Sequence, residues 1–240
     1  MTAAIMIGRR ALPLLGLAAA IAPARADTLG LAVTCDTTLA PALRRAGAAY
    51  RARSGARVFV FPTGPGLILP QLMRNIQNDV VVTQVPILEQ AAQAGIVASV
   101  PGGPRWRNPL VIAGQSERSA IDATFAVSDA TPASDIDGPA MIAQLGLKPA
   151  RVLGAVDTDE VAALLVTGAA QAGLLHMTDV RAHPQLAVIR PVPVDVRPPL
   201  VYAASVTRLA SRPNPEGFVT FLASQDAAAL LSESGLELQA

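Results

Sequence analysis

Short apolar runs alternate with longer helical patterns along most of the chain. The first run covers residues 29–34, and a helical pattern follows over 39–54, where Gly55 offers a stop in the left-handed conformation. Such alternation is typical of βα units, in which helices cover both faces of a largely parallel sheet. The pattern therefore predicts an α/β fold.

The alternation continues to the end of the chain. It predicts further strands at residues 58–61, 79–83, 110–113, 124–128, 151–153, 172–176, 186–189 and 200–205, and helices at 67–75, 87–94, 138–145, 157–167, 215–223 and 225–234. Breaks rich in proline or glycine near 101–108 and 191–200 separate two βα groups. We therefore expect two lobes, the first formed by residues 27–108 and 203–240 and the second by residues 109–202.

Residues 1–26 follow a different pattern. Arg9 and Arg10 precede an apolar stretch at 12–21, and the triplet Ala-Arg-Ala occupies 24–26. This order is that of a cleavable export signal, and the apolar stretch is shorter than the ~20 residues of a spanning helix. We expect a periplasmic mature protein. The arginine pair loosely resembles a twin-arginine signal, but such pairs are common in ordinary leaders, which favours the general secretory route.

The bulk composition restricts both the core and the partners. The chain is 51% hydrophobic but only 3% aromatic and 15% charged, so Ala, Val and Leu must build the core. Removal of the leader takes away three arginines and no acids, which changes the formal charge from +1 to −2. This charge indicates no basic face for nucleic acid or anionic lipid.

The residues that carry metal or redox chemistry are few. Cys35 is the single cysteine, so no internal disulfide forms, and we expect a small buried side chain at a strand end. The two histidines, His176 and His183, show no metal-ligand spacing. The sequence therefore predicts no metal site and no cofactor. It also shows no spaced acid–base pair or activated nucleophile, which argues against an enzyme.

Four segments, taken in order, resemble the molybdate/tungstate-binding family of periplasmic solute-binding proteins that serve ABC importers. Residues 39–55 resemble its first helix, 63–72 its serine/glycine-rich loop, 168–179 its Gly-Glu-x-x-x-Gly-Ile-Val-Tyr-x-(Ser/Thr)-Asp segment, and 216–235 its C-terminal helix pair. The resemblance implies a two-lobe, type II periplasmic-binding-protein fold with a hinge. It also implies a monomer that binds one small oxyanion between the lobes and delivers it to an ABC permease in the inner membrane.

The resemblance also implies a set of ligand-binding residues. They are Thr38, Thr63, Gly64, Pro65, Ser134, Thr158 and His176. Most lie where a strand or loop passes into a helix, so free backbone N–H groups could hold a tetrahedral anion there without Arg or Lys.

This chain departs from the family pattern at three places. Gly64 or Pro65 stands where the family has a serine hydroxyl, and Pro65 has no backbone N–H, although Thr63 could substitute. His176 stands where the family has a tyrosine that donates to the oxyanion, and a ring nitrogen can donate instead. Asp36 would place near the ligand a carboxylate that opposes an anion.

Structural roles for these residues stay open beside the binding roles. Thr38 and Thr158 could serve only as helix N-caps, and His176 could be a hydrogen-bonded structural histidine. Trp106 beside the first break is expected to cover the hinge. The departures also leave an alternative function, an accessory or sensory periplasmic module of the same fold that binds a partner protein or a different small ligand.

Overall fold

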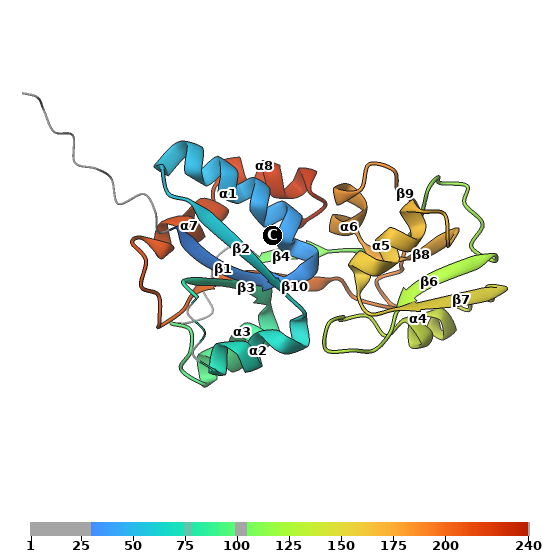
Figure 1. Ribbon diagram of the computed structural model, residues 1–240, viewed down its shortest axis with the longest axis horizontal. Helices are drawn as coiled ribbons and strands as arrows, with labels where there is room; N and C mark the ends of the chain where they lie inside the picture. Colours follow the sequence, from blue (N-terminus) through green and yellow to red (C-terminus); the bar gives the residue numbers. More distant parts are fainter. Residues whose placement is uncertain (1–29, 75, 77, 99–104, 240) are drawn as a thin grey trace, which may run out of the picture.

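The computed structural model describes residues 30–74, 76, 78–98 and 105–239, and these residues form two β-sheets that lie side by side with helices around each (Figure 1). The expected leader at 1–26 and the break at 101–104 lie outside the described residues. Within the described part, no helix combines the length and the apolar character needed to cross a bilayer.

The first sheet has six strands in the order β11-β4-β10-β3-β1-β2. They are β1 (Leu31–Asp36), β2 (Val58–Thr63), β3 (Val80–Gln84), β4 (Arg105–Asn108), β10 (Leu200–Val206) and β11 (Glu237–Gln239). Strands β1, β2 and β3 are parallel, whereas β10 runs antiparallel to both β3 and β4. The carboxyl ends of β1, β2 and β3 therefore share one edge of the sheet.

Helices cover both faces of this sheet (Figure 1). On one face lie η1 (Thr37–Leu39), α1 (Ala40–Ser54), α7 (Pro215–Leu222) and α8 (Gln225–Glu233), and on the other α2 (Pro65–Met73) and α3 (Val85–Gln93). The α1 face holds the aromatic part of the core, where Tyr50 lies 5.3 Å from Phe218 and 5.4 Å from Phe221 between ring centroids. These contacts tie the C-terminal helices to the N-terminal sheet.

The second sheet has five strands in the order β7-β6-β8-β5-β9. Its elements are β5 (Leu110–Gly114), β6 (Thr124–Ser128), α4 (Gly138–Gln144), β7 (Arg151–Ala155), α5 (Thr158–Val166), β8 (Ala172–His176), α6 (Met177–Ala182) and β9 (Ala187–Pro191). Strands β6, β7 and β8 are parallel. Aliphatic side chains of α5 and α6 pack on one face and those of α4 on the other, so this half is the layered α/β unit that the alternation predicts.

The α/β class and most elements are confirmed, and three elements were missed. Strand β4 is a short strand between β10 and the short edge strand β11, and helix α6 begins directly after β8 without a polar linker. Trp106, which was expected to cover the hinge, lies in β4 with its side chain buried in the first core. Periodicity over so few residues carries little signal, and only the pairing in three dimensions defines these elements.

Candidate functional site

The carboxyl ends of the parallel strands of both sheets face one small buried space. Its lining residues are Asp36, Thr37, Thr38, Pro65, Ala133, Ser134, Asp135 and Thr158. In open α/β sheets this edge is where ligands bind, because the loops and helix starts that follow the strands gather there. The space measures about 10 Å³, which is the room of about one water molecule. A larger guest therefore requires the two sides to separate.

Helix starts from both sheets contribute to this lining. Thr37 and Thr38 begin the η1–α1 segment after β1, Pro65 is the first residue of α2, and Thr158 is the first residue of α5. The first backbone N–H groups of a helix have no partner within the helix, and the positive end of the helix dipole lies there. The space is thus bordered by helix ends that favour negative charge, from both halves of the molecule.

The two sides are in close contact at Gly64. A β-carbon at this position would lie 2.5 Å from the α-carbon of Ala133 and 2.7 Å from the carbonyl oxygen of Pro132. The backbone N–H of Gly66 donates to that same Pro132 carbonyl over 3.1 Å. Glycine at position 64 is therefore required for this approach, and the loop before α2 packs directly on the loop before α4.

Asp135 carries the strongest ionic contacts at the space. Its carboxylate lies 3.1 Å from Nε2 of His176 at the end of β8, and the guanidinium of Arg197 donates to it over 3.0 Å. Arg197 also donates to the backbone carbonyl of Asp135 over 2.7 Å. One carboxylate thus pairs with both side chains, and the three residues hold the loop before α4 against the end of β8.

The pKa values of this group follow from its contacts. Burial alone would raise the pKa of Asp135, but the charge and hydrogen bond of His176 and the charge of Arg197 outweigh it, so the pKa lies below its ordinary value. Burial would lower the pKa of His176, but Asp135 and then Asp179 raise it above its ordinary value. The ionised form of Asp135 and the protonated form of His176 therefore stabilise each other.

Asp36 lines the same space in a different setting. Its carboxylate accepts hydrogen bonds from the Thr83 hydroxyl and, over 3.3 Å, from Nε2 of Gln84. Burial raises the pKa of Asp36 to about 7, against the opposing effect of the Thr83 hydrogen bond. Asp36 therefore titrates near neutral pH.

A third polar group joins the two sheets beside the space. The Thr38 hydroxyl donates to Oδ1 of Asp179 over 2.7 Å and lies 2.7 Å from the Thr178 hydroxyl. The Asn108 amide donates to Thr178 over 2.9 Å, and Asp179 accepts from the backbone N–H of His176. Burial raises the pKa of Asp179 to about 6, although the His176 charge and the Thr38 hydrogen bond lower it.

The expected ligand-binding residues divide into two groups. Thr38, Pro65, Ser134 and Thr158 line the space, and Gly64 adjoins it. Thr63 instead donates to Oε1 of Gln71 in its own half over 3.2 Å. His176 is fully buried and contacts the space only through Asp135, which the lining includes.

Sequence reasoning missed the charged partners. Asp135 follows Ser134 directly and could have been found as the next polar residue of that loop, but Arg197 comes from a distant loop and gave no local signal. The capping hypothesis is wrong for both threonines. Asp157 caps α5 by accepting from the N–H of Glu160, and the Thr38 hydroxyl bonds across to the other sheet.

Cys35 is buried in β1, and burial raises the pKa of its thiol far above the ordinary range, so it is not a reactive nucleophile. Among the residues that the structure describes, no group of three or more His, Cys, Asp and Glu side chains is arranged to hold a metal ion.

The chain matches the family of bacterial extracellular solute-binding proteins over residues 31–237. The match covers both sheets and the helix starts between them. The chain belongs to this family. Its type II periplasmic-binding-protein fold agrees with the sequence-based prediction, and the family consists of transport solute-binding proteins.

Solved structures of solute-binding proteins share the fold at low sequence identity. The substrate-binding domain of a putative molybdenum ABC transporter from Clostridium difficile is 17% identical, with a TM-score of 0.67 and coverage of 87% of this chain and 98% of that one. The periplasmic molybdate-binding protein of Azotobacter vinelandii is 16% identical, with a TM-score of 0.70 and coverage of 88% and 100%.

A putative phosphate ABC transporter substrate-binding protein from Clostridium perfringens, with bound phosphate, is 8% identical, with a TM-score of 0.62 and coverage of 88% and 100%. Among curated protein sequences, none matches this chain. At these identities the similarity shows the fold and leaves the solute open.

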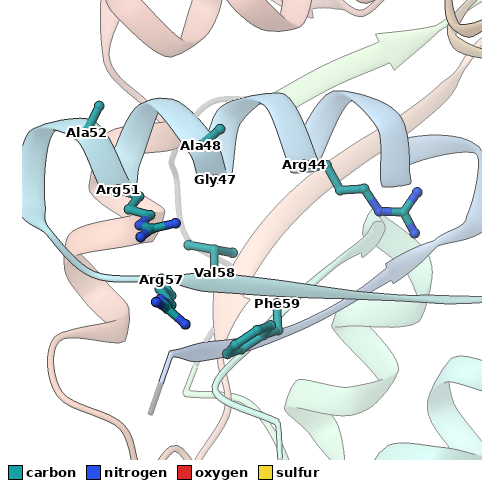
Figure 2. Close-up of a pocket in the computed structure, with 8 residues that line it drawn as sticks. All are labelled: Arg44, Gly47, Ala48, Arg51, Ala52, Arg57, Val58 and Phe59. Carbon is teal, nitrogen blue, oxygen red and sulfur yellow. The ribbon is translucent and has the colours of Figure 1, made fainter. Parts of the chain in front are cut away.

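This solute-binding protein has a second cavity, an open groove of about 710 Å³ between α1 and β2 (Figure 2). Gly47, Ala48 and Val58 lie along it, Arg51 and Arg57 lie together at one end, and Arg44 lies at the other end (Figure 2). Among the described residues that line it, none lies at a helix start and none belongs to the second sheet. The groove therefore lacks the features of the inter-sheet space, and it is a feature of the outer surface.

Proposed function

We propose that this protein is the extracytoplasmic solute-binding component of an ABC importer and that it captures a small oxyanion between its two sheets. The observation that carries this proposal is the convergence of helix starts from both halves on one buried space. Backbone N–H groups at helix starts bind tetrahedral anions without a dedicated cation. Membership of the solute-binding family supports a role in transport and not in catalysis.

We further propose that each sheet with its helices is one lobe of a clamshell, with residues 27–108 and 203–240 in the first lobe and 109–202 in the second. The first residues of β10, Leu200 to Tyr202, pair with β4 in the first sheet, which supports a boundary between the lobes about three residues earlier than 202. The closed space implies that the solute enters while the lobes are apart and that they close on it.

Because of the family resemblance, molybdate and tungstate are the first solutes to test. Two solved structures of similar fold, the putative molybdenum transporter domain and the molybdate-binding protein, support this choice. The proposed ligand set consists of Thr38, Thr63, Gly64, Pro65, Ser134, Thr158 and His176. The remaining parts of the proposal are export to the periplasm after removal of residues 1–26, a monomeric state, and delivery to an ABC permease.

Isothermal titration and thermal unfolding with molybdate, tungstate, sulfate and phosphate test the oxyanion. We expect at least one anion to raise the free energy of unfolding by about 3 kcal/mol at a hundred times its dissociation constant. Ser134→Ala and Thr158→Val should weaken this effect, while Thr167→Val at the far end of α5 should not. If none of the four anions changes the unfolding free energy, the proposed oxyanion function is ruled out, while the assignment of the fold is unaffected.

A second candidate function, binding of a partner protein, is favoured by the groove between α1 and β2. Arg45 and Arg53 of α1 pair with Glu233 and Asp226 of α8, but Arg44, Arg51 and Arg57 enter no ion pair within the described part of the chain. Phe59 of the edge strand β2 lines the same groove and is 46% exposed. A face that is both cationic and apolar suits a partner with an acidic surface.

The two functions separate by experiment. Arg51→Glu combined with Arg57→Glu should abolish capture of an acidic periplasmic partner and leave anion binding unchanged. If the same double variant still captures every partner of the wild type, the groove is not the docking surface.

A further inference from the structure

The two carboxylates that line the inter-sheet space differ in their charge partners. Asp135 contacts both His176 and Arg197. Asp36, within the described residues, forms no ion pair, and its hydrogen-bond partners are the neutral side chains of Thr83 and Gln84. Asp36 is thus the carboxylate of the space that has no direct ionic partner.

An anionic solute in this space has to meet that charge. Two like charges that lie close together in surroundings less polar than water repel each other strongly. An ionised carboxylate can only accept hydrogen bonds, and so can a fully ionised oxyanion. One proton between the two oxygens turns this repulsion into a charge-assisted hydrogen bond, which is among the strongest in proteins.

We propose that Asp36 is the residue that sets the specificity of this site, and that the closed complex holds one proton shared between its carboxyl group and the bound oxyanion. This inference rests on the proposed oxyanion function. An oxyanion that is fully ionised in solution, such as molybdate, tungstate or sulfate, requires Asp36 to be protonated in the complex, and above neutral pH that proton is taken up from solvent on binding. Hydrogen phosphate brings a proton of its own.

The surroundings direct the proton to Asp36. The titratable groups that act on it are Asp135 and His176 across the space, while Cys35 beside it on β1 and Tyr202 on β10 carry pKa values that Asp36 raises. Asp135 is held ionised by its two cations, and burial keeps the Cys35 thiol and the Tyr202 phenol protonated. Asp36, with a pKa raised to about 7 by burial, is the carboxyl group that can hold or release the proton.

The inference makes selectivity depend on pH. Above neutral pH, the affinity for molybdate, tungstate and sulfate should fall by about tenfold per pH unit, because each binding event takes up one proton. The affinity for phosphate should change by less than about threefold over the same interval. The preference for a hydrogen-bearing oxyanion therefore grows as the pH rises from 7 to 8.5.

Isothermal titration with each of the four anions at pH 6 to 8.5, in two buffers of different ionisation enthalpy, counts the protons directly. For the wild type we expect close to one proton taken up per molybdate, tungstate or sulfate at pH 8, and close to none per phosphate. Asp36→Asn should abolish the uptake and flatten the pH dependence. The matched control Asp137→Asn, an exposed helix cap in the neighbouring loop, should behave like the wild type.

A second variant tests the same inference if Asp36→Asn does not fold. Thr83→Val removes the hydrogen bond that lowers the pKa of Asp36, so the pH dependence of sulfate or molybdate binding should move to higher pH. Binding without proton uptake, or uptake that persists in Asp36→Asn, would overturn this inference and leave the oxyanion function intact. If the wild type binds none of the anions, the proposed function and this inference fail together.

Discussion

Asp36 and Asp135 border the same space from opposite sheets, and their surroundings move their pKa values in opposite directions. The Asp135 side chain is 13% exposed and faces two cations, which bring its pKa below the ordinary value. The buried Asp36 faces hydroxyl and amide donors, and its pKa rises to about 7. Burial acts on both carboxyl groups, so the ionic partners decide the direction of the shift.

This difference in pKa shows that two aspartates that line the same space can have different roles. Asp135 fastens its loop to the end of β8 through His176 and Arg197. Asp36 is left as the titrating group of the space. Pairs of titratable groups whose pKa values are pushed apart are typical of functional sites.

The largest expected effect comes from removing the raised acid. Below about pH 4 Asp36 is protonated in both folded and unfolded chains, and as the pH rises to about 7 only the folded chain retains the proton. The wild-type free energy of unfolding should therefore fall, relative to that of Asp36→Asn, by about 4 kcal/mol over this interval.

Urea unfolding at half-unit pH steps measures this difference. Asp137→Asn serves as the control, since that exposed carboxylate keeps its capping role as an amide. Parallel stability curves for the wild type and Asp36→Asn between pH 4 and 7 would contradict the environment assigned to Asp36.

The next effect tests the other carboxylate. Asp135→Ala leaves His176 and Arg197 without their shared partner, and removal of one member of a nearly buried ion pair costs about 3 kcal/mol. Chemical denaturation at pH 6 gives the loss of unfolding free energy. The exposed carboxylate of Asp129 supplies the control in Asp129→Ala, and equal losses in the two variants would show that the ion pairs contribute nothing specific.

A smaller effect is expected at the contact between the sheets. Thr38→Val removes the hydroxyl that donates to Asp179 and lies against Thr178, which leaves a buried carboxylate oxygen short of a donor. The loss should be about 1–2 kcal/mol in the free energy of unfolding. The control is Thr37→Val, at a half-buried neighbour that lines the same space. An equal loss of unfolding free energy in the control would show that the effect of Thr38→Val does not come from its hydrogen bonds.

The smallest effect is a shift in titration. Arg197 lowers the pKa of both Asp135 and His176, so Arg197→Gln should raise both pKa values. NMR titration of the His176 ring protons measures the change. The exposed Arg190→Gln variant should leave that titration unchanged, and a fall in the His176 pKa in Arg197→Gln would contradict the geometry of the cluster.

Much of the fold could be predicted because the signals are local and repeated. The helical pattern that Gly55 closes is found as α1, and Gly55 takes the expected left-handed conformation at φ 79°. The strand before His176 is found as β8. Short elements such as β4 and β11 were not predicted, since three or four residues define no period and their pairing partners are distant in sequence.

The candidate site could be predicted only in part. Thr38, Pro65, Ser134 and Thr158 mark helix starts or a loop before one, and such positions are visible in a sequence. Arg197 lies 62 residues from Asp135, and nothing in either local sequence indicates that they meet.

The amino-acid sequence by itself determined the α/β class, the positions of the long helices and the polar residues that follow the strands, because these depend on periodicity and on turn and capping chemistry within a few residues. Only the tertiary structure decided which of those residues share a space, and which charges are neutralised. Burial and long-range ion pairs fix the protonation of a carboxyl group, and both are properties of the packed molecule. Asp36 and Asp135 are the same residue type, and their opposite pKa shifts arise from that packing alone.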